Sequence, residues 1–356
     1  MKLSGRIKSP AFAALCVVSV AFGFFTGSVL GTIGFFLAFG APYFLMTELP
    51  PYASIAERFG QYVFLMICTM IFLFLITPIL VIMPLSFNAE PYFTFTDGML
   101  SFDSSAYSLR WYQDIFNFGM TDPNGTGSAW WQDMWNNSVW IGAFRNSFFI
   151  AIMATLLATG FGTLAALGLS RSEMPFRTLI TSLLISPMIV PLVITATGMF
   201  FFYAKKDFFP FFPDGLVNTY VGLILAHATL GIPFVIITVT ATLTGFDQSL
   251  IRASQGLGAN GWTTFRKVIM PLILPGMISG ALFAFITSLD EVVAVIFLAD
   301  VDQRTIPRQM FSGIREQISP TILAVATVLV LFSIVLLTAV ELLRRRTERL
   351  RGLSPG

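Results

Sequence analysis

The chain has 356 residues, of which 55% are hydrophobic and 11% are charged, and its formal net charge is +2. Its mean hydropathy is +0.79. A soluble domain usually carries about 25% charged residues, so this chain has too few charges to cover a surface that faces water. The composition excludes an ordinary soluble protein and predicts an integral membrane protein. The two cysteines, Cys16 and Cys68, lie far apart in apolar runs, a spacing that favours neither a metal site nor a disulfide.

The N-terminal segment begins with Lys2, Arg6 and Lys8 and continues as an apolar stretch over 11–46. As a single helix this stretch would be about 54 Å long, whereas the hydrocarbon core of a bilayer is about 30 Å thick. Glycines in its middle allow a turn, so we expect a hairpin of two short spans that returns the chain to its starting side. One long tilted span and a cleaved signal peptide are the alternatives.

Six further stretches have the length of a membrane-spanning helix, which needs about 20 mostly apolar residues. They lie at about 61–86, 144–170, 178–203, 217–243, 270–299 and 319–343. A β-barrel strand would need only about 10 alternating residues, so the predicted fold is an all-α membrane bundle. With the N-terminal hairpin it would have eight spans, and with one long N-terminal helix it would have seven. Prolines inside the spans, such as Pro187 and Pro191, would kink or break helices there.

Basic residues predict the orientation of the bundle, because Lys and Arg are enriched in cytoplasmic loops. They gather in three segments that an even number of crossings would place on one side: the loop at 171–177, the loop at 244–269 and the tail from Arg344 to Arg351. We therefore expect both termini to be cytoplasmic. The longest loop on the other side, about 87–143, is rich in Asp and Trp, as a segment at the outer interface would be.

One cytoplasmic segment, 249–271, has a pattern of its own. A short polar stretch leads to a turn that glycines permit around Gly256–Gly261, and a second short helix runs into the next span. Small Ala253 and Ser254 would let another protein approach closely. The pattern predicts a compact helical elbow in the cytosol, suited to docking a partner.

This segment resembles the signature loop of the permeases of binding-protein-dependent ABC importers. That signature reads Glu-Ala-Ala, three residues, Gly, nine residues and Ile-x-Leu-Pro. The corresponding residues here are Arg252, Ala253, Ser254 and Gly258, with Ala259 the first of the nine residues that follow and Pro271 at the end of the motif. The resemblance implies that these residues form the coupling loop, which seats in a cleft of a separate ATPase subunit. The departure is Arg252, because the family usually has Glu at this position.

The resemblance extends over about 59–345 and is strongest to permeases for polyamines and related substrates, including opines and ferric iron. The supporting matches are Ser108–Tyr112, Arg145–Ser147, Ala226-His227, Ser288–Glu291 and Thr305–Pro307. We therefore expect an N-terminal extension at 1–58, a permease domain at 59–345 and a basic tail at 346–356. The insertion at 119–138 has no counterpart in the resemblance. The family implies the bacterial inner membrane and three partners: an ABC ATPase, a second permease subunit, identical or not, and a periplasmic binding protein.

Asp290 and Glu291 lie toward the outer part of the fifth clear span. Carboxylates at membrane depth usually face a bundle interior or an aqueous cavity. One of them is therefore a candidate to line the path of a cationic substrate, while a structural role or an interfacial position is the alternative. Adjacent helical residues point about 100° apart, so both are not expected to line one path.

No catalytic machinery is expected. The chain has one histidine, no His-Glu-x-x-His pattern and no Gly-x-x-x-x-Gly-Lys-Ser/Thr loop for ATP phosphates. We predict a transport subunit without catalytic residues, metal or cofactor, surrounded by membrane lipid and binding no nucleic acid. A membrane-embedded enzyme and a stand-alone channel or secondary transporter are the rival classes, and neither requires an elbow for an ATPase.

Overall fold

The computed structural model describes residues 54–171, 173–244, 249–316 and 319–350, together with five isolated positions before residue 54. The expected hairpin at 11–46 and Cys16 therefore fall outside the described residues. The chain forms two compact units, Met1–Ser86 and Phe87–Gly356. All regular elements in the described part are helices or turns, and the predicted all-α fold is confirmed.

In the first unit, helix α4 (Ile55–Leu85) is a 31-residue apolar helix. It begins earlier than the sequence suggested because Ser54 and Glu57 form a capping box: the Glu57 amide donates to the Ser54 hydroxyl at 3.2 Å, and the Ser54 amide donates to Glu57 Oε2 at 2.8 Å. None of its side chains before Leu85 is buried, and most of them are exposed. An apolar helix with this exposure suits a lipid environment.

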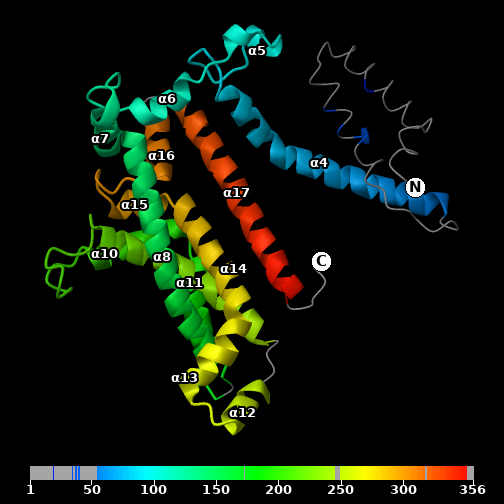
Figure 1. The fold of residues 1–356 in the computed structure, drawn as a ribbon, viewed down its shortest axis with the longest axis vertical. Helices are drawn as coiled ribbons and strands as arrows, with labels where there is room; N and C mark the ends of the chain where they lie inside the picture. Colours follow the sequence, from blue (N-terminus) through cyan, green and yellow to red (C-terminus); the bar gives the residue numbers. More distant parts are fainter. Residues whose placement is uncertain are drawn as a thin grey trace. The chain divides into compact units, whose positions relative to one another are not determined.

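The second unit contains the other helices, drawn from cyan to red in Figure 1. They are α5 (Asp97–Leu100), a 3-10 turn (Ser104–Ala106), α6 (Arg110–Asn117), α7 (Gly127–Asn137), α8 (Val139–Leu169), α9 (Arg177–Ile189), α10 (Leu192–Tyr203), α11 (Tyr220–Thr244), α12 (Ser249–Gly256), α13 (Gly261–Thr264), a π-helical turn (Phe265–Ile269), α14 (Met270–Asp290), α15 (Val293–Leu298), α16 (Ile306–Glu316) and α17 (Thr321–Leu350).

Helices α8, α11 and α14 pack together as the centre of this unit (Figure 1). Small residues allow the close approach: a Cβ added to Gly231 would lie 2.9 Å from the Cβ of Ala284 on α14 and 3.2 Å from that of Ala158 on α8. Gly280 is equally constrained, since its Cβ would lie 2.7 Å from the Cα of Val235. Lipid offers no hydrophobic driving force between helices, so such small-residue contacts are what hold a membrane bundle.

The third predicted span is broken, as the prolines inside it predicted. It consists of α9 and α10, which meet at an angle of 105°. Pro191 has no amide hydrogen, and it forces the preceding Val190 into an extended conformation with φ −69° and ψ 136°. In the described part of the chain, five helices are long and apolar enough to cross a membrane, or six if this bent pair counts as one span.

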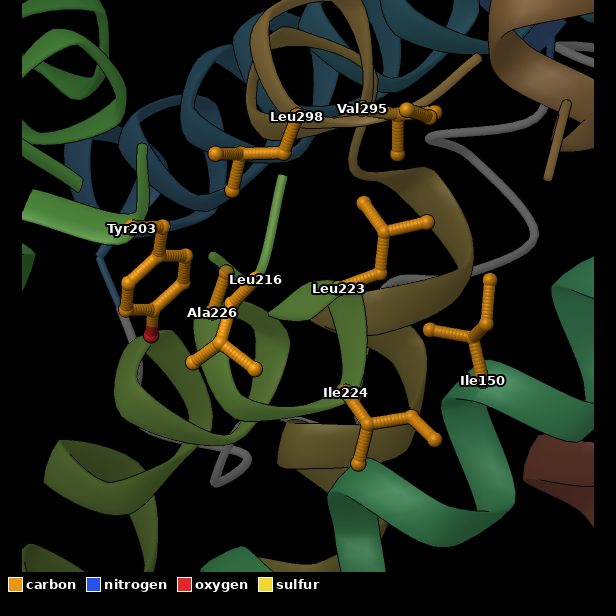
Figure 2. Close-up of a cluster of buried hydrophobic side chains, with 9 residues drawn as sticks. Ile150, Tyr203, Leu216, Leu223, Ile224, Ala226, Val295 and Leu298 are labelled. Atoms are coloured by element: carbon orange, nitrogen blue, oxygen red, sulfur yellow. The ribbon is translucent and has the colours of Figure 1, made fainter. Parts of the chain in front are cut away.

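The fifth predicted span, 270–299, also ends earlier than expected. Helix α14 stops at Asp290, Glu291 is extended with φ −72° and ψ 119°, and α15 begins as a separate short helix. Figure 2 shows why α15 remains attached: Val295 and Leu298 lie in a buried cluster with Ile150 of α8, Tyr203 of α10 and Leu223 of α11.

A second buried cluster joins α6 and α17 to α8. Trp111, Trp140 and Ile322 are among its members. Thr321 is the first residue of α17, and its hydroxyl donates a hydrogen bond to the carboxylate of Asp114 on α6 at 2.5 Å. These contacts fix the end of the unit that lies far from α12 and α13 along α8 (Figure 1).

Candidate coupling elbow and transport path

The first limb of the elbow, α12, ends in a Schellman motif. Gly258 has φ +81°, its amide donates to the carbonyl of Gln255 at 2.9 Å, and the Ala259 amide donates to the carbonyl of Ser254 at 3.1 Å. This pair of bonds satisfies carbonyls that the helix end leaves free. Only glycine adopts such a left-handed conformation without strain, so the sharp turn depends on Gly258.

The second limb begins at Asn260, whose side chain accepts a hydrogen bond from the Thr263 amide at 2.8 Å. This is an N-cap for α13. The hydroxyls of Ser254 on α12 and Thr264 on α13 lie 2.9 Å apart and form a hydrogen bond, and Thr264 is buried. The bond joins the two limbs, so Ser254 has a role inside the elbow besides being small.

The elbow continues directly into α14 through the π-helical turn at Phe265–Ile269, in which the Met270 amide donates to the carbonyl of Phe265. Pro271 follows at the start of α14. A proline inside a helix lacks the amide and crowds the carbonyl four residues earlier, here that of Lys267, and a wider turn removes that conflict. Pro271 therefore shapes the junction between elbow and span, a feature that the sequence motif alone did not reveal.

The outer surface of the elbow combines small, basic and apolar groups. Arg252, Ala253 and Gly258 are exposed, while Ala259 is half-buried. Two large apolar side chains are also exposed, Leu257 by 89% and Trp262 by 68%. Sequence reasoning did not single them out, although large apolar residues at a glycine turn are a usable signal. Exposed apolar groups gathered in one place are typical of a surface that another protein covers.

A cavity of about 650 Å³ separates the elbow from the end of α8. Ser170, Arg171 and Glu173 line one side, and Gln255 and other elbow residues line the opposite side. The basic loop that begins at Arg171 therefore lies at the same end of the bundle as the elbow. The distribution of positive charges in the sequence predicted that these two segments lie on the same side of the membrane, and this placement agrees with that prediction.

Asp290 and Glu291 are neighbours in sequence but occupy different environments. Asp290, the last residue of α14, is exposed, whereas Glu291 is only 6% exposed. The Glu291 carboxylate accepts a hydrogen bond from the Ala294 amide at 2.8 Å and so caps the first turn of α15. Of the two candidates, Glu291 has a structural contact, and Asp290 is the one left free to meet a solute.

The motif around Asn146 also proves to be structural. The Asn146 amide donates to the carbonyls of Asp302 and Arg304 at 2.8 and 3.1 Å, and its oxygen accepts from the Tyr220 hydroxyl at 2.9 Å. Next to it, the Ser147 hydroxyl accepts from the Ile306 amide at 2.8 Å. These bonds fasten the loop after α15 to α8.

The single histidine, His227, is buried in α11, and its Nδ1 lies 2.7 Å from the hydroxyl of Ser288 on α14. This hydrogen bond joins two central helices, as expected of a structural residue. Within the described ranges no group of three or more His, Cys, Asp or Glu side chains could hold a metal ion.

Comparison with known proteins identifies the family. Residues 158–349 match the family described as binding-protein-dependent transport system inner membrane component. The chain belongs to this family. The match covers the elbow, the π-helical turn and all of α14, so the features described above lie inside the family's own domain.

Two individual proteins match a longer part of this chain than the family match does. The chain is 30% identical over 248 residues to the spermidine/putrescine transport system permease protein PotC of Haemophilus influenzae, which covers 70% of this chain and 89% of the relative. It is 29% identical over 229 residues to the sulfate transport system permease protein CysT of Escherichia coli, covering 62% and 82%. A crystal structure of a bacterial ABC transporter involved in the import of the acidic polysaccharide alginate shares the fold, with a TM-score of 0.57 at 15% identity over 82% of this chain and 99% of that one.

The family membership makes this chain a permease subunit of an ABC importer in the inner membrane, and so a transport subunit rather than an enzyme. The elbow and the acidic break between α14 and α15 occupy different places in this subunit. One lies at the end of the span that bears the basic loops, and the other lies at the opposite end of the same span.

Proposed function

We propose that this permease moves a polyamine, a small organic polycation, from a periplasmic binding protein into the cytoplasm. The observation that carries the proposal is the 30% identity to a spermidine/putrescine permease over 89% of that relative's length. The relatives described above are polyamine and sulfate permeases, so they lend no support to the ferric iron alternative.

The energy for transport comes from a separate ATPase that docks on the elbow. The exposed Ala253 and Gly258 permit close approach, and the exposed Leu257 and Trp262 supply apolar area for a partner to bury. Because the elbow runs without a break into α14, a push on it is delivered to the span that carries Asp290. Two permease subunits moving in this way would alternate between inward- and outward-open states.

Arg252 gives this docking surface an unusual charge. Its side chain is exposed at the position where related permeases usually carry Glu. We expect the ATPase of this system to present an acidic or neutral group to Arg252, because a like charge across an interface is unfavourable. Both termini and the basic loops are cytoplasmic in this account.

Asp290 attracts the cation at the outer part of the path. It is exposed in the single subunit and is the last residue of α14. Glu291 is buried and occupied in capping α15, so its contribution is to the shape of the break.

The test is uptake of radiolabelled putrescine and spermidine by the assembled transporter in proteoliposomes, with its binding protein present. Asp290→Asn should raise the KM for polyamine uptake and leave ATPase assembly unchanged. Asp214→Asn is the matched control, because Asp214 is also an exposed acid and lies in the loop between α10 and α11, and it should behave like the wild type. Unchanged uptake kinetics in Asp290→Asn would remove the pathway role, and uptake of sulfate in place of polyamine would overturn the substrate.

A further inference from the structure

Helix α7 presents three different faces. Met134 is buried against the rest of the unit, with 6% of its surface exposed. Trp131 and Trp135, four residues apart and so on one stripe, are exposed by 63% and 53%. Gln132 and Asn136 form the next stripe, about 100° around the helix, and are also exposed. The helix thus has an aromatic side next to its buried contact and a polar side opposite that contact.

The fold uses the polar groups of the neighbouring side chains, whereas the indole rings of Trp131 and Trp135 are largely exposed. Asp133 accepts a hydrogen bond from the Asp122 amide at 2.8 Å and another from Asn137 at 2.6 Å, and the Trp130 indole donates to the carbonyl of Pro123 at 3.2 Å. Among the described residues, the indole N–H groups of Trp131 and Trp135 have no acceptor. Their exposure therefore points to an environment outside this chain.

The aromatic stripe continues onto the side of α8 through Arg145. The Arg145 guanidinium lies 5.4 Å from the centre of the Trp135 ring, and its Nη1 donates to the Trp135 carbonyl at 3.3 Å. One turn further along α8 is Phe149, followed by Met153 and Leu156, all of them exposed. The surface thus passes from indole rings to a cation and then to apolar side chains along one span.

This order matches the depth profile of a bilayer. Trp is enriched at the headgroup level, a long basic side chain reaches the interface while its stem packs on apolar surface, and exposed apolar residues face the hydrocarbon. The aromatic and polar sides of α7 are those of a helix lying in the interface. A binding protein is the less fitting occupant, because the stripe runs down the side of α8 away from the end of the bundle.

We propose that Trp131, Trp135 and Arg145 form a lipid anchor at the leaflet opposite the elbow. The indoles lie among the phospholipid headgroups and upper acyl chains, where their N–H groups donate to ester or phosphate oxygens, and Arg145 pairs with a lipid phosphate. The anchor rests on the membrane location of the chain and is independent of the substrate. Trp131 and Trp135 belong to the insertion at 119–138, which has no counterpart in the sequence motifs that the family shares, whereas Arg145 lies in one of those motifs.

The test uses the assembled transporter in nanodiscs of phosphatidylethanolamine and phosphatidylglycerol, made either with ordinary acyl chains or with chains brominated near the headgroup. Tryptophan emission is recorded for the wild type and for the double variant Trp131→Phe/Trp135→Phe, and subtraction gives the emission of the two indoles. We expect this difference emission to be present in ordinary lipid and lost in brominated lipid, and to resist iodide added to the water. The substitutions are conservative and at exposed positions, so the fold is retained.

A matched control places an indole on the polar stripe. Gln132→Trp, made in the double variant, should add emission that iodide quenches and brominated lipid does not. Difference emission that brominated lipid leaves unchanged and iodide quenches would overturn the anchor. Emission that shifts to the blue only when the loaded binding protein is added would overturn it in favour of a protein partner. Polyamine uptake measured in the same nanodisc preparation after transfer to liposomes separates failure of the anchor from failure of the transport proposal.

Discussion

Gly258 is the residue on which the shape of the elbow depends, and replacing it with alanine tests the docking account. Its φ of +81° lies in the left-handed region, and an added Cβ would meet nothing within 4 Å. The penalty for Gly258→Ala is therefore purely conformational, about 1–2 kcal/mol. That lowers the equilibrium constant for the native turn by a factor of about 5–30. If the ATPase binds only the native turn, its Kd rises by up to the same factor.

The assay is titration of the ATPase onto the purified permease in nanodiscs. Gly256→Ala is the matched control, because Gly256 lies inside α12 and an added Cβ would likewise meet nothing within 4 Å. Alanine should favour that helix by about 0.5–1 kcal/mol, so the control should bind as well as the wild type or better. Equal Kd values for the two alanine variants would refute the assignment of the elbow as the docking surface.

Three further substitutions test the packing and the caps. Asn146→Ala leaves two loop carbonyls without their donor and should lower the free energy of unfolding by about 1–3 kcal/mol, measured by thermal unfolding in detergent, whereas the exposed Asn136→Ala should have little effect. Gly231→Val places a Cβ within 2.9 Å of a Cβ on α14 and should lower the free energy of unfolding by about 1–3 kcal/mol. Gly198→Val is its control, because a Cβ there would meet nothing within 4 Å. Equal losses of stability in the two variants would contradict the tight packing. Asn260→Ala removes the cap of α13 and should destabilise that helix by about 0.5–2 kcal/mol. The elbow should then be cleaved faster in limited proteolysis, and an unchanged cleavage rate would argue against the cap.

The helical content and the elbow could be predicted from sequence because both are encoded locally. Apolar runs of about 20 residues define spans, and the turn at Gly258 follows from a glycine within a polar segment. The break at Pro191 was also foreseeable, since proline constrains its predecessor. The local pattern could not predict the angle of this break, because a mild kink and a 105° bend have the same sequence signature.

The candidate site was less predictable because its contacts are distant in sequence. Asn146 bonds to carbonyls more than 150 residues away, so the motif that contains it gives no hint of its partner. Asp290 and Glu291 look equivalent in sequence, and only the end of α14 between them separates an exposed acid from a buried cap. The π-helical turn before Pro271 was missed for a related reason. The proline predicts a clash with the carbonyl four residues earlier, but the sequence does not show which local geometry relieves that clash.

The central claim, that this permease is driven through its elbow by a separate ATPase, is tested most directly by polyamine uptake into proteoliposomes that contain the complete transporter. The account predicts that uptake requires both ATP on the elbow side and the loaded binding protein on the other, and that Gly258→Ala weakens it while Gly256→Ala does not. Uptake that continues without ATP, or that is indifferent to the binding protein, would contradict the account and identify a channel or a secondary transporter.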